Sequence, residues 1–189
     1  MTELPNRSVS RRRLLAGAAA GLSVGVAGCS GGENASITPV SLDGERACDQ
    51  CGMIIEDHPG PVGQIHFEDD EPEGGRPGQF CSSTCTYRYR FDAEAEGRTV
   101  EAAFLTDYSS VEYEVFTEGG DTQFSSHVES EAFERMPALT VVARSEVVGA
   151  MGPELIPFSE EGDVTAFTDE YGGEPMPATD VERSTLEAL

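Results

Sequence analysis

The sequence predicts an α+β fold made of two small β-β-α-β lobes. Residues 61–106 contain two strand-like stretches, then helix-start signals, then a third strand-like stretch. Residues 139–181 contain the same order of patterns. In addition, Phe80-Cys81-Ser82 and Phe158-Ser159-Glu160 both stand where a predicted strand gives way to a predicted helix. These matching corners indicate that the second half of the chain repeats the first.

The first lobe is expected over residues 46–108, with three strands and one helix. Apolar and β-favouring stretches predict the strands, which are residues 61–67, a short strand ending at Phe80, and residues 98–106. The acidic, Gly- and Pro-rich residues 68–78 are typical of an exposed hairpin loop. Ser82 or Ser83 can cap a helix that runs towards Glu96, because a serine hydroxyl can accept a free N–H of the first turn.

The second lobe is expected over residues 109–183. Its strands are predicted at residues 111–116, 139–148, 154–158 and 175–181. Ser159 can cap a helix that ends at residues 172–173, since these are glycines and tolerate the left-handed conformation of a helix C-terminus. Residues 125–135 are expected to form a brief helical connection, and residues 184–189 a frayed tail.

Residues 1–28 have the features of a twin-arginine lipoprotein signal peptide. Arg11 to Arg13 precede an apolar run of about 15 residues, which is shorter than the roughly 20 that a membrane-spanning helix needs. The run ends in Val26-Ala27-Gly28-Cys29, which resembles a lipobox. The sequence therefore predicts export by the twin-arginine route, which carries folded proteins.

Cys29 is expected to be the lipidated first residue of the mature protein. The lipid would hold the protein on the outer face of the cell membrane. The alternative is a free cysteine beside an ordinary cleavage site. Residues 29–45, which begin with a stretch rich in Gly, Ser, Asn and Pro, are predicted to form a flexible tether between the lipid and the folded domain.

The composition is strongly acidic, with 35 acidic and 12 basic residues and a net charge of −23. All of the basic residues are arginines. Residues 1–28 contain four of these arginines and one glutamate, so their removal takes the net charge to −26. A lysine-free acidic surface predicts adaptation to high salt, with recruitment of cations or of a basic partner as the alternative. Nucleic acid is excluded as a partner because phosphate binding needs a basic face.

Four of the five cysteines lie in two short motifs. Cys48 and Cys51 form a C-x-x-C turn, whose geometry brings both sulfurs within reach of one metal ion. Gly52 suits such a turn, because the residue after the second ligand commonly needs a positive φ. Cys81 and Cys85 stand one helical turn apart and would share a face at the start of the predicted helix.

These motifs predict a metal site of Cys48, Cys51, Cys81 and Cys85. Four sulfurs can form the tetrahedral site of structural zinc. Met53 and Met151 are candidate thioether ligands, and thiolates combined with thioethers favour Cu(I). Two disulfides in an exported protein, or a redox-active C-x-x-C, are the alternatives.

Two histidines near these motifs were also considered as ligands. His58 lies in a turn close to the C-x-x-C motif and could complete a coordination shell. His66 alternates with Ile65 on a predicted strand, so it should point away from the face that Ile65 buries. A surface or hydrogen-bonded histidine is the favoured interpretation of His66.

The order of several motifs resembles the NosL family. The motifs are C-x-x-C-G-M at residues 48–53, Q-I-H-F at 64–67, T-D-Y at 106–108 and M-G-P-E-L-I-P-F at 151–158. The resemblance covers about residues 46–173, and the last of the four motifs is its most specific part. It implies two β-β-α-β lobes similar to the core of organomercury lyase.

The resemblance also implies a function. NosL proteins are membrane-anchored Cu(I)-binding accessory proteins, not enzymes, that help to assemble the copper centres of nitrous oxide reductase. The string F-C-S-S-T-C at residues 80–85, however, resembles small metal-binding modules of the TRASH/YHS type. That likeness implies a cell-surface module with structural zinc as a second function class. A thiol oxidoreductase or a relative of organomercury lyase is the third.

Overall fold

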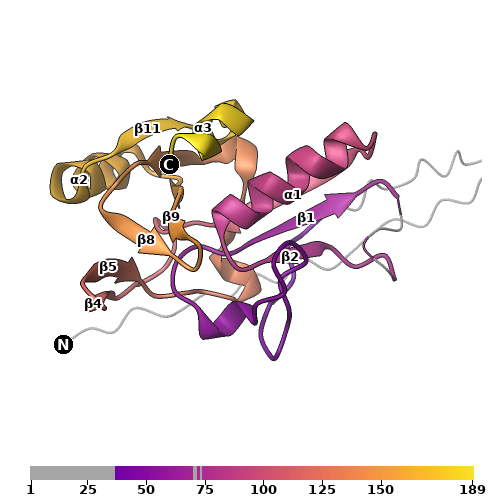
Figure 1. Cartoon of the computed structure of the whole chain (residues 1–189), viewed down its shortest axis with the longest axis horizontal. Helices are drawn as coiled ribbons and strands as arrows, with labels where there is room; N and C mark the ends of the chain where they lie inside the picture. The colour runs from indigo at the N-terminus through magenta and orange to yellow at the C-terminus, as the bar shows by residue number, and fades with distance from the viewer. Residues whose placement is uncertain (1–36, 70–71, 73) are drawn as a thin grey trace, which may run out of the picture. The chain divides into compact units, whose positions relative to one another are not determined.

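The structure, a computed structural model, describes residues 37–69, 72 and 74–189. Its first sheet has four antiparallel strands in the order β2-β1-β3-β6 (Figure 1). These are β1 (Gly63–Phe67), β2 (Gly78–Phe80), β3 (Val100–Thr106) and β6 (Phe133–Arg135). Helix α1 (Ser83–Ala95) packs against β1, β2 and β3. The predicted β-β-α-β order of the first half is thereby confirmed.

Helix α1 begins and ends as the sequence predicts. The Ser82 hydroxyl accepts a hydrogen bond from the backbone N–H of Cys85 at 2.8 Å, which satisfies one free donor of the first turn. After Glu96, Gly97 takes a φ of 87°, which is the left-handed conformation that ends many helices. The cap places Cys81 just before the helix and Cys85 in its first turn.

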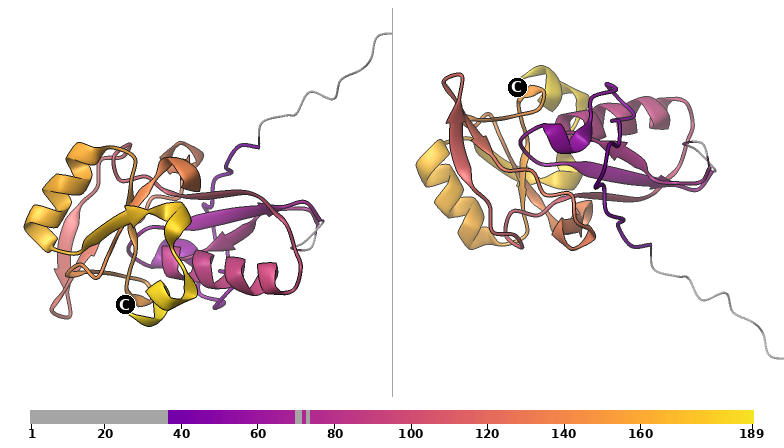
Figure 2. Two further views of the ribbon diagram at one scale, coloured as in Figure 1. Left: turned by 90° about the horizontal axis from the view of Figure 1, so that it is seen from above. Right: turned by 90° about the horizontal axis from the view of Figure 1, so that it is seen from below.

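A second set of elements repeats this topology. Its sheet has the order β10-β7-β11, made by β7 (Thr140–Ala143), β10 (Ile156–Phe158) and β11 (Glu174–Pro177). Helix α2 (Glu161–Tyr171) connects β10 to β11 and packs against all three strands (Figure 2). The registers agree as well, because Gly63 faces Phe80 in the first sheet and Thr140 faces Phe158 in the second. The predicted repeat of strand-to-helix corners is confirmed.

The third sheet was not predicted. It has the order β4-β5-β8-β9, with β4 (Val115–Glu118), β5 (Asp121–Phe124), β8 (Val147–Gly149) and β9 (Gly152–Pro153). The single strand expected at residues 139–148 is therefore wrong: it divides into β7 and β8, which lie in different sheets. The chain turns at Arg144, whose φ is 58°. The strand expected at residues 111–116 begins only at Val115.

The expected helical connection at residues 125–135 is also largely wrong. Only Ser130–Ala132 form a short 3-10 helix, η2, and the next residues form β6 on the edge of the first sheet. Three further 3-10 helices are η1 (Ile55–Asp57), η3 (Met136–Ala138) and η4 (Ala178–Asp180). The predicted cap of α2 differs too, since Ser159 precedes the N-cap residue Glu160 and bonds to Asp107 instead.

Both ends of the described chain are more ordered than predicted. Residues 37–45 belong to the expected tether, yet Val40 exchanges two hydrogen bonds with the Gln64 side chain and Leu42 is fully buried. Residues 184–189 were expected to fray, but Arg183–Glu187 form helix α3, which contacts α1. Leu42 is buried in the core, whereas Leu186 and Leu189 are only partly buried and pack against it.

The buried residues form two clusters. The larger contains Cys48, Cys81 and Cys85 and also takes in Val141 and Leu155 from the second half. The smaller is rich in aromatic rings and lies around Phe124 in the second half. Because the larger cluster draws on both halves, the lobe boundaries at residues 46–108 and 109–183 stay a prediction.

The described residues contain no helix with the length and apolar character required to cross a membrane. The signal peptide, its twin arginines and the lipidation of Cys29 concern residues outside the described part of the chain. They stay predictions.

Candidate metal centre

The C-x-x-C turn is held by backbone hydrogen bonds. The N–H of Cys48 donates to the carbonyl of Met53, and the N–H of Gly52 donates to the carbonyl of Cys48, both at 2.8 Å. Gly52 has a φ of 80°, as the sequence predicts for the residue after the second cysteine. The turn is closed by an isolated β-bridge between Ala47 and Ile54.

Asp49 joins this turn through hydrogen bonds to β2, the strand that leads into α1. Its carboxylate accepts hydrogen bonds from the backbone N–H of Gln79 at 2.8 Å and from the Arg76 guanidinium at 2.7 and 2.8 Å. The Asp49 N–H in turn donates to the carbonyl of Gln79. Since Gln79 lies two residues before Cys81, these bonds bring the two cysteine motifs together.

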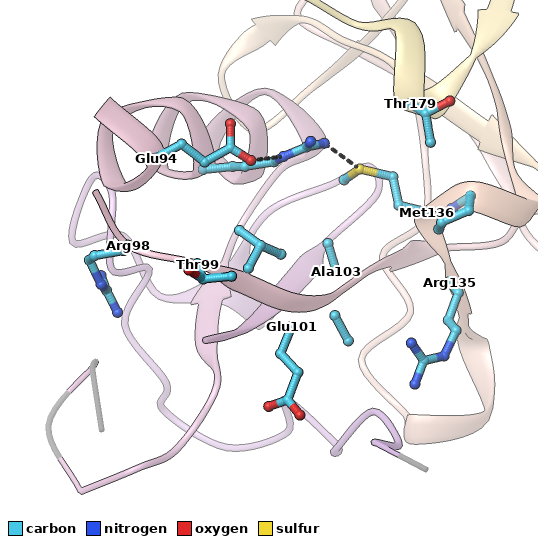
Figure 3. Close-up of a pocket in the computed structure, with 12 residues that line it drawn as sticks. Glu94, Arg98, Thr99, Glu101, Ala103, Arg135, Met136 and Thr179 are labelled. Carbon is cyan, nitrogen blue, oxygen red and sulfur yellow. Dashed lines mark hydrogen bonds and ion pairs between the residues drawn. The ribbon is translucent and has the colours of Figure 1, made fainter. Parts of the chain in front are cut away.

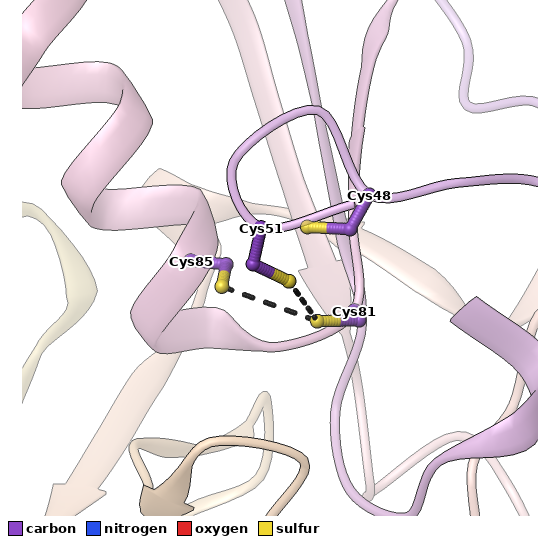
Figure 4. A group of neighbouring side chains, drawn as sticks. All are labelled: Cys48, Cys51, Cys81 and Cys85. Carbon is purple, nitrogen blue, oxygen red and sulfur yellow. Dashed lines mark hydrogen bonds between the residues drawn. The ribbon is translucent and has the colours of Figure 1, made fainter. Parts of the chain in front are cut away.

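The four cysteine sulfurs converge on one point (Figure 4). All lie within 4.8 Å of one another; the Cys51 and Cys81 sulfurs are 3.4 Å apart, and those of Cys81 and Cys85 are 3.9 Å apart. No disulfide joins them. A tetrahedral ion with metal–sulfur bonds of about 2.3 Å would hold its sulfurs about 3.8 Å apart. The spacing therefore fits one soft metal ion.

The burial of the four thiols is unequal. Cys81 and Cys85 are fully buried and Cys48 is nearly so, whereas Cys51 is exposed. The site therefore has a closed side in the protein core and an open side at Cys51. A metal ion or a partner's ligand can reach the sulfurs from the open side only.

The thiols of Cys48, Cys81 and Cys85 differ in pKa. Hydrogen bonds from the thiols of Cys81 and Cys85 lower the pKa of Cys48 well below its ordinary value. Hydrogen bonds with Cys48 and with Cys85 raise the pKa of Cys81, and the hydrogen bond with Cys48 raises the pKa of Cys85 to about 12. A thiolate at Cys48 is thus stabilised by two thiol donors. A metal ion that takes all four sulfurs as thiolates must displace these protons.

The two candidate thioethers lie in different settings. Met53 is half-buried and packs against the core cluster that holds the cysteines. Met151 lies in the turn of the β8–β9 hairpin and is 37% exposed. Glu154, three residues further on, bonds to Thr84 beside Cys85, so this hairpin lies against the start of α1. Both ligand assignments stay predictions.

The two histidines lie outside the cysteine group, which takes in neither of them. The ring of His66 contacts Phe104 edge-on at 5.8 Å, on the opposite side of the strand from buried Ile65. Burial lowers the pKa of His66. His66 points away from the Ile65 face as expected, but it is a half-buried packing residue whose Nε2 has no hydrogen-bond partner among the described residues, and not the expected surface or hydrogen-bonded histidine. His58 is half-buried in the turn that precedes Gly60.

Sequence reasoning missed two buried carboxylates, Glu154 beside the site and Asp107 at the second strand-to-helix corner. Glu154 is fully buried, and its Oε1 accepts from the N–H and hydroxyl of Thr84 and from the N–H of Leu155. Burial raises its pKa to about 7. Asp107 accepts from the N–H and hydroxyl of Ser159. The available signal for Glu154 was a lone acid directly before the apolar string Leu-Ile-Pro-Phe.

Comparisons with known proteins agree with this geometry. The copper-binding lipoprotein NosL of Stutzerimonas stutzeri is 27% identical over 168 residues, which cover 88% of this chain and 78% of that protein. The crystal structure of the copper chaperone NosL from Shewanella denitrificans superposes with a TM-score of 0.60 at 23% identity. That match covers 76% of this chain and 95% of the other, and shows a common fold. The NosL family model matches residues 39–186, and the chain therefore belongs to the NosL family.

Proposed function

We propose that this protein is a Cu(I)-binding accessory protein that delivers copper for the maturation of nitrous oxide reductase. The observation that carries the proposal is the group of four thiols within 4.8 Å of one another in a NosL fold. The names of the relatives, a copper-binding lipoprotein and a copper chaperone, support copper as the metal and a carrier rather than an enzyme.

The arrangement suits a metal that must be both held and released. Thiolates and thioethers are the ligands that Cu(I) prefers over harder ions. Cys51 is exposed and gives a partner protein access to the bound ion, while buried Cys81 and Cys85 exclude competing ligands. Exposed Met151, together with Met53, would supplement the thiolates with weaker neutral ligands during transfer.

Structural zinc is the second candidate, and one observation favours it. Cys48, Cys81 and Cys85 are part of the main hydrophobic core, so an ion bound there would join elements that the fold needs. Structural zinc sites are closed sets of four ligands whose binding energy contributes to folding. A cell-surface zinc module would use the same four sulfurs.

Metal analysis distinguishes the two candidates. Protein purified without oxygen is titrated with Cu(I) in the presence of bicinchoninate, which competes for Cu(I) and changes colour. Delivery requires that the protein take Cu(I) from this chelator and pass it to metal-free nitrous oxide reductase. If zinc stays bound and Cu(I) remains with the chelator, the cysteines form a zinc module and the copper proposal is wrong.

The proposed location is the outer face of the cell membrane, with lipid on Cys29. Support comes from the lipobox-like end of residues 14–28 and from the relative named as a lipoprotein. One acyl chain binds a membrane only weakly, so a stable anchor implies more than one chain on this residue. Replacement of Cys29 with Ser should release the protein from the membrane fraction. Unchanged fractionation would contradict the anchor.

We also propose a high-salt environment, which the net charge of −23 and the absence of lysine support. At low ionic strength the acidic surface repels itself over a Debye length of about 30 Å at 0.01 M. The melting temperature should therefore rise with added NaCl. A melting temperature that does not change between dilute and molar salt would remove this proposal.

A further inference from the structure

Strand β3 has an edge that is only partly paired. Its residues Phe104 to Thr106 pair with β6, but within the described chain no strand pairs with residues 100–103 on that side. The pairing stops because β6 ends at Arg135 and the chain turns into η3, which has Pro137 in its first turn. Half of β3 therefore presents a sheet edge to which another strand could be added.

A groove of about 460 Å³ runs along this open edge (Figure 3). Its floor includes Ala102 and Ala103, whose small side chains leave room for a second backbone to approach. Met136 and Thr179 line the far side, and the exposed part of α1 around Glu94 lies above. The groove is separate from the cysteine group.

Three of the residues that line the groove are arginines, Arg90, Arg98 and Arg135, and two are acidic, Glu94 and Glu101. The arginines are three of the eight at positions 37–189 of a chain whose net charge is −23. Arg90 pairs with Glu94 and Arg98 pairs with Asp69. Arg135 is the groove arginine for which no ion pair is found among the described residues.

Arg135 is held so that its charge faces the groove. Its guanidinium donates to the carbonyl of Ile37 at 2.7 Å and stacks 5.1 Å from the centre of the Phe104 ring. Charged side chains often protect sheet edges from pairing with copies of the same chain. Here copies already repel one another through their acidic surfaces, so protection does not require these arginines.

We propose that this groove binds an extended segment of a partner protein, carrying one or two carboxylates, as an added strand on the edge of β3. Backbone hydrogen bonds to residues 100–103 would supply affinity, as in other complexes formed by strand addition. A carboxylate of the segment would pair with Arg135 and set specificity. A second copy of this chain is the alternative occupant, which dimerisation of the protein in the absence of peptide would reveal. The inference goes beyond the proposed function, because it concerns how a partner is held and not the metal.

Binding is measured by fluorescence anisotropy with the full mature protein and a short labelled peptide in which Glu alternates with Val. The ionic strength is set near 0.15 M, where a Debye length of about 8 Å screens the remote acidic surface but spares contacts inside the groove. The peptide with Gln in place of Glu should bind about twofold to fivefold more weakly per lost contact, since exposed ion pairs contribute modestly. A peptide with methylated backbone nitrogens should lose at least about tenfold, because several hydrogen bonds are removed.

Three variants localise the binding. Arg135→Gln should weaken the Glu peptide about twofold to fivefold, whereas Arg135→Lys, which keeps the charge, should retain most of the affinity. Arg144→Gln removes one positive charge from the turn between β7 and β8, outside the groove, and should leave binding unchanged. Melting curves confirm that each variant is folded.

Several results would overturn the proposal. Equal affinity for the methylated and unmethylated peptides would mean ionic adsorption without strand addition. Equal losses in Arg135→Gln and Arg144→Gln would place the peptide elsewhere. If anionic phospholipid vesicles displace the peptide from the wild type but not from Arg135→Gln, the groove is a lipid contact instead. Cu(I) titration of Arg135→Gln should match the wild type, so that failure of this inference and failure of copper binding are distinguishable.

Discussion

The two strand-to-helix corners of the molecule have the same backbone topology, but their side chains differ. In the first, β2 leads into α1 through Cys81 and the capping Ser82; in the second, β10 leads into α2 through Ser159. The first corner meets the C-x-x-C turn and gathers four thiols. The second meets the carboxylate of Asp107, which accepts both the N–H and the hydroxyl of Ser159.

The side chains that pack around the two corners also differ. Around the second corner, Phe158 contacts Phe167 with ring centres 5.1 Å apart, and Phe167 contacts Phe124 at 5.6 Å. Aromatic packing and hydrogen bonds hold this corner without any metal. In the first corner, buried thiols occupy core positions that a metal ion can bind. The fold therefore supplies the corner twice, and the side chains decide which copy has sulfur ligands that could hold a metal ion.

The largest expected effect is that of Cys81→Ser. This change removes the sulfur that lies 3.4 Å from that of Cys51 and 3.9 Å from that of Cys85, and it should abolish metal binding. A ligand present at a thousandfold excess over its dissociation constant stabilises by about 4 kcal/mol, so loss of the ion should cost at least about that much. Thermal unfolding with and without metal measures the effect. A variant that melts like the metal-loaded wild type would contradict a structural contribution of the ion.

The next effect concerns Glu154, which joins the β8–β9 hairpin to the first corner. Folding raises its pKa from 4.5 to about 7, chiefly by burial, so the folded state favours the protonated carboxyl. The corresponding stability is complete below pH 4.5 and is lost as the pH rises through about 7, with a total of about 3 kcal/mol.

Urea unfolding between pH 5 and pH 8 tests this linkage. Glu154→Gln cannot ionise, so the free energy of unfolding should fall less with rising pH than in the wild type. Glu161→Gln, at an exposed residue of α2, serves as the control and should keep the wild-type slope. Identical slopes for the wild type and Glu154→Gln would show that Glu154 does not titrate in this range.

A smaller effect is expected at the second corner. Ser159→Ala removes the hydroxyl that donates to Asp107 at 2.7 Å but keeps the backbone N–H bond. A hydrogen bond to a charged group contributes about 1.5–3 kcal/mol. Chemical denaturation should show a loss in the free energy of unfolding near the lower end of this range, because the site is only partly buried. Cu(I) binding should stay unchanged. Loss of copper in this variant would mean that the two corners do not act separately.

The smallest effect on stability should come from Met151→Leu. The substitution conserves volume and should cost less than about 1.5 kcal/mol, because Met151 is exposed. If the thioether supplements the thiolates, Cu(I) affinity should fall by roughly tenfold, which corresponds to about 1.4 kcal/mol. Competition with bicinchoninate measures the affinity, and Met176→Leu on β11 is the matched control. Unchanged affinity would remove Met151 from the site.

The fold was predictable where local patterns and tertiary structure agree. The positive φ of Gly52 and the start of α1 at Ser82 were predicted correctly, because a glycine turn and a serine cap each act within a few residues. The β-branched residues from Thr140 to Val148 were predicted as one strand, although the polar residues 144–146 interrupt them. The turn at Arg144 was missed because the left-handed conformation there is adopted by a residue that rarely takes it. The third sheet was missed because it pairs short strands that lie far apart in the sequence.

The pairing of the cysteines was predictable, but the setting of the cysteine group was not. Spacing placed the cysteines in two pairs, because C-x-x-C and a helical turn both fix sulfurs locally. The hydrogen bonds between Asp49 and Gln79 join the two pairs. The contacts of Glu154 with Thr84 and of Val40 with Gln64 join residues far apart in sequence, and no local pattern reports them. The exposure of Cys51 beside three buried thiols likewise depends on the assembled core.

The most direct test of metal binding at the first corner is X-ray absorption at the copper edge of protein loaded with one equivalent of Cu(I). We predict a first shell of sulfur atoms only, from the cysteines with or without a thioether. The signal should be lost in Cys81→Ser and retained in Ser159→Ala. A first shell that contains nitrogen or oxygen, or a sulfur shell that persists in Cys81→Ser, would contradict the assignment of copper to these four cysteines.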